Sequence, residues 1–251
     1  MSEEFNVKSL ASGAEQDARK VAYKLFDNCP IPNKEILANT GLFVKRQELT
    51  KSLFFNELYD HVKGVHGVIM EFGVRWGQNL VTLANLRGIH EPYNHSRKII
   101  GFDTFEGFLE TDAADGDHQV INAGSLAVTK GYEEYLQQVL DYHELESPLN
   151  HVKKNSLRKG NAPDQLKVYL DENPETMVAM AWFDMTVYKP TYECLQLLKG
   201  HITKGSIIGF DELNDHQFPG ETVAVKEALG LENIRVQRNR FSGAQSYVIV
   251  E

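Results

Sequence analysis

The spacing of apolar residues changes character along the chain. From Glu15 to about His61 they recur every three or four positions, the period of one helix face. From Val68 onward, short apolar runs alternate with helical patterns, and glycine or proline stands at many of the junctions. This alternation predicts a parallel sheet with helices on both faces. We therefore expect an N-terminal helical cap over residues 1–64 and an α/β domain over residues 65–251.

Seven short segments of the chain have the composition of strands. They are residues 68–72, 98–103, 157–161, 177–184, 206–211, 234–236 and 247–250. Gly88 is expected to end the first helix of the domain, and Pro190 and Pro219 to begin two later helices. The last two segments are only about ten residues apart, too close for a helical crossover. The pattern predicts a seven-stranded, mostly parallel sheet that ends in an antiparallel hairpin.

Residues 104–130 interrupt this alternation. They show little periodicity, and their first half is rich in acidic residues. Unstructured loops of this length in compact domains are usually functional lids or disordered segments. A helical pattern, with Tyr132, Leu136 and Leu140 on one face, follows directly. We predict that the segment is a mobile lid.

Composition narrows the classes of partner. The chain has 251 residues, 42% of them hydrophobic, and a net charge of −9 from 35 acidic and 26 basic residues. This charge disfavours binding to nucleic acid or to an anionic membrane. No signal-peptide pattern and no apolar run of about 20 residues is present, so a cytoplasmic protein is expected. Cys29 and Cys194 have no metal-ligand spacing, and composition leaves open whether the chain forms a homo-oligomer.

Two features indicate a cofactor site. Gly73 and Gly77 stand where the first strand turns into a helix, and glycine there lets a ligand approach the backbone. The turn lacks the GxGxxG spacing, and such glycines can also serve only to let strand and helix pack. Asp103 ends the second strand, where an acid can accept hydrogen bonds from both ribose hydroxyls of a nucleotide. The alternative for Asp103 is a helix cap or a solvated loop residue.

Three further acids follow the fourth and fifth strands. Asp184, Asp211 and Glu212 are expected at the same edge of the sheet as Gly73 and Asp103. Carboxylates placed together repel one another unless a cation lies among them, and oxygen ligands suit Mg²⁺, Mn²⁺ or Ca²⁺. The alternatives are helix caps, or an Asp184 that contacts only the cofactor.

Two histidines are weaker candidates for a base that works near neutral pH. His118 lies in the acidic lid, and His216 follows the fifth strand. A solvated loop histidine is the alternative for each. The phosphate-binding GxxxxGK loop, the GxSxG nucleophile motif and the HExxH zinc motif are absent from the sequence.

Several of these segments resemble the macrocin O-methyltransferase-like family, class I methyltransferases that act on sugar or phenol hydroxyls of natural products. The matching segments are residues 71–77, 101–107, 131–136, 183–188 and 210–222 in the order expected, and residues 245–250 resemble the last strand of the family. The most specific is Gly101-Phe-Asp-Thr-Phe-Glu-Gly107. Residues 211–214 and 219–222 look most like the branch that contains the rhamnosyl O-methyltransferase of calicheamicin biosynthesis.

The resemblance implies a Rossmann-like class I methyltransferase fold, S-adenosylmethionine as cofactor and a small-molecule acceptor hydroxyl. It implies a magnesium site formed by Asp184, Asp211 and Glu212. The residues that it implies around the cofactor are Glu71, Gly73 and Gly77 at the methionine part, Asp103 at the ribose, Asn161 near the adenine, and, with no part of the cofactor specified, Thr104 and Asp184.

The chain departs from the family after the fourth strand. The family pattern Asp-x-Asp-x-Tyr reads Asp184-Met-Thr186-Val-Tyr188 here, and Lys189 stands where an acid is common. We expect direct displacement at the sulfonium methyl group, with Mg²⁺ lowering the pKa of the acceptor hydroxyl. Asp184 is the first candidate for the base and His118 the second. The rival hypotheses are a non-catalytic homologue that binds S-adenosylmethionine, suggested by Thr186, and a nucleotide-dependent oxidoreductase.

Overall fold

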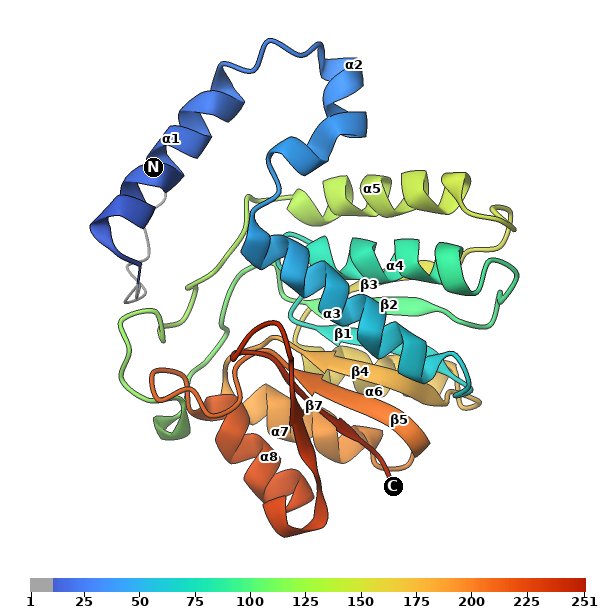
Figure 1. The fold of residues 1–251 in the computed structure, drawn as a ribbon. Coiled ribbons are helices and arrows are strands. Elements are labelled where there is room, and N and C mark those ends of the chain that lie inside the picture. The colour runs from blue at the N-terminus through green and yellow to red at the C-terminus, as the bar shows by residue number, and fades with distance from the viewer. Residues whose placement is uncertain (1–10) are drawn as a thin grey trace. The chain divides into compact units, whose positions relative to one another are not determined.

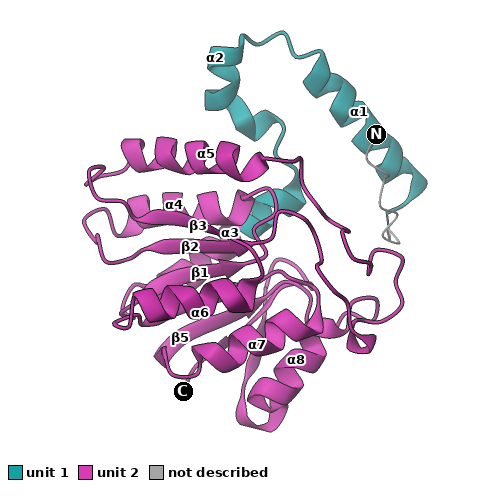
Figure 2. Cartoon of the chain, turned by 180° about the vertical axis from the view of Figure 1, so that it is seen from behind, with its two compact units in different colours: residues 1–51 teal, residues 52–251 magenta. Residues whose placement is uncertain are grey.

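The structure, a computed structural model, describes residues 11–251 (Figure 1). The first ten residues of the predicted helical cap lie outside the described residues. The chain forms two compact units, residues 1–51 and residues 52–251, which Figure 2 distinguishes by colour. The boundary therefore falls at Lys51, whereas the sequence pattern placed it at residue 64.

The first unit is helical, as its periodicity predicted. It contains α1 (Gly13–Asp27), α2 (Asn33–Ile36), the 3-10 helix η1 (Leu37–Leu42) and the first turn of α3 (Arg46–Val62). A capping box begins α1: the Glu15 N–H donates to Ser12 Oγ at 3.3 Å, and the Ser12 N–H donates to Glu15 Oε2 at 2.8 Å. No residue of α1, α2 or η1 is buried.

The rest of α3 belongs to the second unit because of its packing. Five residues of this helix are buried, Phe54, Phe55, Leu58, Tyr59 and Val62. The Phe55 ring lies edge-on to the Trp182 ring of the sheet, with centroids 4.8 Å apart. Helical periodicity shows which face of α3 is apolar, but it does not show what that face covers.

The second unit has a seven-stranded sheet in the order β3-β2-β1-β4-β5-β7-β6. Its strands are β1 (Val68–Phe72), β2 (Ile99–Asp103), β3 (Asn155–Lys159), β4 (Val178–Phe183), β5 (Ile202–Phe210), β6 (Val236–Arg238) and β7 (Ser246–Ile249). The first five are parallel, and β7 pairs antiparallel with both β5 and β6. The predicted fold class and its C-terminal hairpin are confirmed, although β3 lies two residues earlier than expected and β6 two residues later.

Helices cover both faces of the sheet (Figure 1). They are α4 (Gln78–His90), α5 (Tyr132–Glu146), α6 (Ala162–Glu172), α7 (Tyr188–Leu198) and α8 (Gly220–Leu229), with 3-10 turns η2 (Ala113–Asp115) and η3 (Leu231–Asn233). One hydrophobic core contains residues of α3, α4 and α5, and a second contains residues of α6, α7 and α8. The prediction that Gly88 ends α4 was wrong, because the helix continues to His90. No described helix is long and apolar enough to span a membrane.

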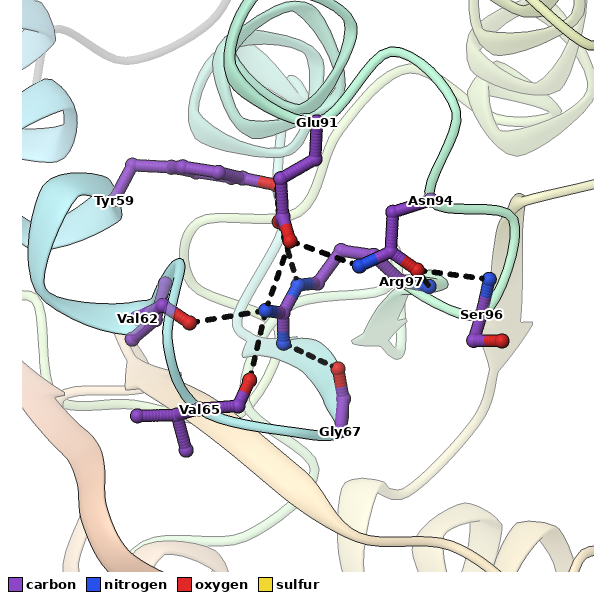
Figure 3. Close-up of polar contacts among 8 residues, drawn as sticks. All are labelled: Tyr59, Val62, Val65, Gly67, Glu91, Asn94, Ser96 and Arg97. Carbon is purple, nitrogen blue, oxygen red and sulfur yellow. Dashed lines mark hydrogen bonds and ion pairs between the residues drawn. The ribbon is translucent and has the colours of Figure 1, made fainter.

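A buried arginine closes the edge of the sheet where β1 and β2 begin (Figure 3). Arg97 is 2% exposed and forms an ion pair with Glu91, Nε to Oε2, at 2.8 Å. Its guanidinium also donates to the carbonyl oxygens of Gly67, Val62 and Val65 at 2.5, 2.9 and 2.8 Å. The Arg97 side chain therefore connects the end of α3 to the start of β1. This contact lies at the amino ends of the strands, whereas the candidate acids follow the carboxyl ends.

Candidate active site

The carboxyl ends of β2, β1, β4 and β5 lie side by side in the sheet. A row of stacked phenylalanine rings holds them together, with centroids 4.9 Å apart for Phe102 and Phe72, 4.8 Å for Phe72 and Phe183, and 5.4 Å for Phe183 and Phe210. All four rings are fully buried. The residue that follows each phenylalanine is a candidate from the sequence, namely Gly73, Asp103, Asp184 or Asp211. The predicted site residues therefore directly follow the carboxyl ends of neighbouring strands, and the packed rings fix the positions of these ends.

Glycine is required at positions 73 and 77 because of packing. Gly73 has φ 89°, and an added Cβ would collide with the backbone carbonyl of Asp184. Gly77 has φ 82°, and its Cβ would collide with the Leu136 side chain of α5. These contacts match the packing alternative for the glycine turn. Glu71, two residues before Gly73, is fully buried in β1.

Asp103 is held against the glycine turn. Its Oδ2 accepts from the Arg75 N–H at 2.7 Å and its Oδ1 accepts from the Phe105 N–H at 2.5 Å. Each carboxylate oxygen keeps a further lone pair, and the residue is only partly buried. The carboxylate is therefore oriented by backbone donors and can still accept from a ligand.

The other predicted cofactor residues contact residues that are close to them along the chain. The Thr104 hydroxyl donates to the Gly107 carbonyl at 2.7 Å and accepts from the Glu106 N–H at 3.1 Å. Asn161 precedes α6, and its Nδ2 donates to Asp164 Oδ2 at 2.9 Å. Both side chains are partly buried. Their roles toward a cofactor stay predictions.

The acids after β4 and β5 form one electrostatic cluster. Asp184 Oδ2 accepts from Asn79 Nδ2 of α4 at 3.3 Å, and Asp211 Oδ1 accepts from Gln245 Nε2 at 3.1 Å. Burial, and then the charges of Asp184 and Asp211, raise the pKa of Glu212 to about 8. The structure thus brings together the three acids that the sequence singled out.

A fourth acid joins this cluster from α8. Glu221 is fully buried, and burial followed by the charges of Glu212, Asp184 and Asp211 raises its pKa well above its ordinary value. Its carboxylate accepts from the backbone N–H groups of Met185, Thr186 and Glu212 at 3.1, 3.3 and 3.2 Å. Four carboxylates, rather than three, therefore surround the ends of β4 and β5.

The donor set of this cluster suits a hard cation. Glu212 Oε2 is buried and has no hydrogen-bond partner within the described part of the chain. Carboxylate oxygens are the ligands that Mg²⁺ and Ca²⁺ prefer, and a cation would offset the repulsion among the acids. Between residues 11 and 251, however, no group of three or more His, Cys, Asp or Glu side chains is arranged to hold a metal ion.

Thr186 occupies the position of the second acid in the family pattern. It is 6% exposed and has φ 65°, a left-handed conformation that is unusual for a β-branched residue. Its hydroxyl lowers the pKa of the Glu212 carboxyl, which opposes the effect of burial. Lys189 forms an ion pair with Glu110 of the lid at 2.5 Å. Thr186 and Lys189, the two residues that differ from the family pattern, therefore both interact with other side chains of this chain.

The predicted lid is anchored at its centre. Asp115 is 1% exposed, and its Oδ1 accepts from the Tyr188 N–H at the start of α7 at 2.5 Å. Val120 and Ile121 form a small apolar cluster with Phe218, which precedes α8. Residues 109–113 and 122–124 on either side of this anchor are exposed.

The two histidines differ in position. His118 Nδ1 accepts from the Val120 N–H at 3.3 Å, and its ring lies edge-on to Phe218 with centroids 5.0 Å apart. These contacts place His118 in the apolar cluster of the lid. The His216 side chain is 91% exposed, which matches the alternative of a solvated loop histidine.

Asn79, Asp115 and Glu221 were not predicted from the sequence. Asn79 lies on the second residue of a helix, and Asp115 is one of many acids in the lid. Glu221 resembles an ordinary acid in the first turn of a helix, where acids are common. A signal for Glu221 was nonetheless present, because residues 219–222 were among the segments that resembled the family.

Comparisons with known proteins show which solved structures this chain resembles. No protein-family model and no curated protein sequence matches the chain. Among solved structures, the crystal structure of CalS11, calicheamicin methyltransferase, is 40% identical over 96% of this chain and 94% of that chain, with a TM-score of 0.93. The apo structure of CalS11, described as a TDP-rhamnose 3′-O-methyltransferase of calicheamicin biosynthesis, is 38% identical over 96% of each chain, with a TM-score of 0.84.

A more distant structure shares the fold. The O-methyltransferase NovP is 18% identical over 80% of this chain and 79% of that chain, with a TM-score of 0.61. At this identity the likeness concerns the arrangement of helices and strands, which matches the predicted fold class.

Proposed function

The chain belongs to the family of S-adenosylmethionine-dependent class I O-methyltransferases that contains the calicheamicin methyltransferase CalS11, and we propose that it methylates a hydroxyl of a nucleotide-linked deoxysugar. The observation that carries this proposal is the cluster of Asp184, Asp211 and Glu212 beside the glycine turn and Asp103, at one edge of the sheet. CalS11 acts on TDP-rhamnose, which suggests the acceptor class. A sugar of a glycosylated natural product is the broader alternative.

We assign the cofactor to the carboxyl ends of β1 and β2. Asp103 would accept hydrogen bonds from the ribose hydroxyls, because its carboxylate is already oriented by Arg75 and Phe105. Glu71 and the turn from Gly73 to Gly77 would contact the methionine part. Thr104 and Asn161 would border the ribose and the adenine.

The chemistry needs a base and a fixed acceptor. S-adenosylmethionine supplies the methyl group on a sulfonium, which makes that group reactive. We propose that Asp184 is the base that removes the proton of the acceptor hydroxyl. The Asn79 amide donates to Asp184 Oδ2 and so orients this carboxylate. His118 stays the second candidate, and motion of the lid would be needed to free it from its contact with Phe218. The protein thus contributes chiefly position and proton removal.

We also propose that Asp184, Asp211 and Glu212 hold a divalent cation, with Mg²⁺ the first candidate. The support is their oxygen chemistry, their mutual repulsion and the buried Glu212 Oε2. A cation bound there would lower the pKa of the acceptor hydroxyl. The non-catalytic alternative rests on Thr186, which stands where the family pattern has a second acid.

The assignment of the cofactor predicts which nucleotide stabilises the protein. S-adenosylhomocysteine at one hundred times its Kd should stabilise the fold by about 2.7 kcal/mol. For a unit of this size that corresponds to a rise in Tm of roughly 5–10 °C. NAD should leave the Tm unchanged, because the turn lacks the GxGxxG spacing. Micromolar binding of NAD in calorimetry, with no response to S-adenosylhomocysteine, would favour the oxidoreductase instead.

The lid should respond to ligands at its exposed stretches. In the free protein we expect a glutamate-specific protease to cut after Glu110, which is exposed beside the Asp115 anchor. S-adenosylhomocysteine together with an acceptor should slow this cleavage, because closure would order the segment. Trypsin cleavage after Arg240, in another exposed loop, serves as the control and should keep its rate. Equal rates at Glu110 with and without ligands would argue against a mobile lid.

A further inference from the structure

Glu221 spans the two loops that carry the acid cluster. The sheet ladder ends at the pair Phe183 and Phe210, and the last bond between these strand ends is from the Asp211 N–H to the Phe183 carbonyl at 3.0 Å. Beyond it, Glu221 Oε1 accepts from the Met185 and Thr186 N–H groups, and Oε2 accepts from the Glu212 N–H. One carboxylate therefore replaces the ladder where the two loops leave the sheet.

The residue before Glu221 makes this reach possible. Gly220 begins α8, and an added Cβ would lie 2.5 Å from Asp115 Oδ1, 2.7 Å from the Thr186 carbonyl oxygen and 2.8 Å from the Tyr188 nitrogen. Glycine thus lets the start of α8 press against the loop after β4. This contact gives a physical reason for the segment Pro219-Gly-Glu221, which the cofactor and acid assignments leave unused.

The bonds of Glu221 fall on residues that need support. Met185 directly follows Asp184, and Glu212 directly follows Asp211. Thr186 has φ 65°, and a β-branched residue holds that conformation only where its surroundings fix it. Glu221 is fully buried among like charges. Burying a polar side chain among other acids is unfavourable for stability, which points to a role in the site.

We infer that Glu221 is a positioning residue, which sets the loops after β4 and β5 so that Asp184 and Glu212 face the same acceptor hydroxyl. The role in turnover rests on the proposed methyl transfer. Glu221 itself bonds only to backbone groups of the two loops in the contacts above, so it acts through the acids.

The test compares Glu221→Gln with Glu227→Gln. A glutamine at position 221 can accept from Met185 and Thr186 through its amide oxygen, but its NH₂ group cannot accept from Glu212. We expect kcat to fall about 10-fold or more, with the KM for S-adenosylmethionine and the Kd of S-adenosylhomocysteine within about 2-fold of wild type. Glu227 lies on the same helix and accepts from the Tyr188 hydroxyl at 2.6 Å, and its variant should keep wild-type kcat.

A second measurement does not depend on turnover. Amide hydrogen exchange at Glu212 should be faster in Glu221→Gln than in wild type, while exchange in the core of β1 is unchanged. Unchanged exchange at Glu212, or wild-type kcat in an active protein, would overturn the inference. A variant that does not fold, or that loses affinity for S-adenosylhomocysteine in parallel with kcat, would show a purely structural role and would also overturn it. A wild-type protein without methyl transfer would refute the proposed function, and the exchange result would still decide the positioning role.

Discussion

Replacing Asp184 with asparagine is expected to reduce methyl transfer by about 10²–10⁴-fold, the usual effect of removing a general base. The amide has nearly the same shape but cannot take the proton of the acceptor hydroxyl. Cofactor binding should change little, because Asp103 and the glycine turn lie beside β1 and β2. Turnover measured with saturating S-adenosylmethionine, together with calorimetry of S-adenosylhomocysteine, checks both expectations.

Asp215→Asn is the matched control for that variant. Asp215 lies in the loop after β5 and accepts from the Gln217 N–H at 2.7 Å, so its loss removes an equal charge without removing the proposed base. Excess EDTA should reduce wild-type turnover if Asp184, Asp211 and Glu212 hold a cation. Wild-type activity that is unchanged in EDTA would remove the metal from the mechanism, and an active Asp184→Asn would remove the base assignment.

The second large effect is expected on the thermal stability of the protein, from a residue at the amino ends of β1 and β2. Arg97→Met keeps an apolar stem but removes the buried cation that pairs with Glu91 and donates to the carbonyl groups of Val62, Val65 and Gly67. Glu91 keeps its neutral donors, the Tyr59 hydroxyl and the Asn94 amide. Breaking a buried ion pair of this kind costs about 3–5 kcal/mol. The Tm should fall by roughly 10 °C, which differential scanning calorimetry measures.

Arg158→Met provides the comparison for Arg97. Arg158 pairs with Glu172 at 2.8 Å, but the two side chains are 27% and 52% exposed. Surface pairs contribute about 0–1 kcal/mol, so this variant should melt within a few degrees of wild type. Equal Tm shifts for the two variants would mean that the buried network around Arg97 is not a major source of stability.

The sequence was sufficient for the sheet because its signals are local. Apolar runs followed by glycine or an acid identified the ends of β1, β2, β4 and β5, and parallel topology then placed Asp103, Asp184 and Asp211 at one edge. The short interval before the last strand predicted the antiparallel hairpin, which is confirmed.

The features that were wrongly predicted or missed from the sequence depend on contacts that form only in the folded protein. Nothing local distinguishes Glu221 from other acids in a first helical turn, because its three donors lie up to 36 residues away along the chain. Gly88 has room for a Cβ at 3.5 Å from the nearest neighbouring atom and no positive φ, so it does not interrupt α4. The apolar face of α3 was visible in the sequence, but its partner Trp182 was not.

Turnover of a defined acceptor tests the central proposal most directly. The wild-type protein is incubated with S-adenosylmethionine, Mg²⁺ and TDP-rhamnose, the acceptor of CalS11, and the sugar nucleotide is analysed by mass spectrometry. We expect a product heavier by one methylene group, formed in equal amount with S-adenosylhomocysteine and formed about 10²–10⁴-fold more slowly with Asp184→Asn. An acceptor of unchanged mass, while calorimetry shows that S-adenosylmethionine is bound, would contradict it.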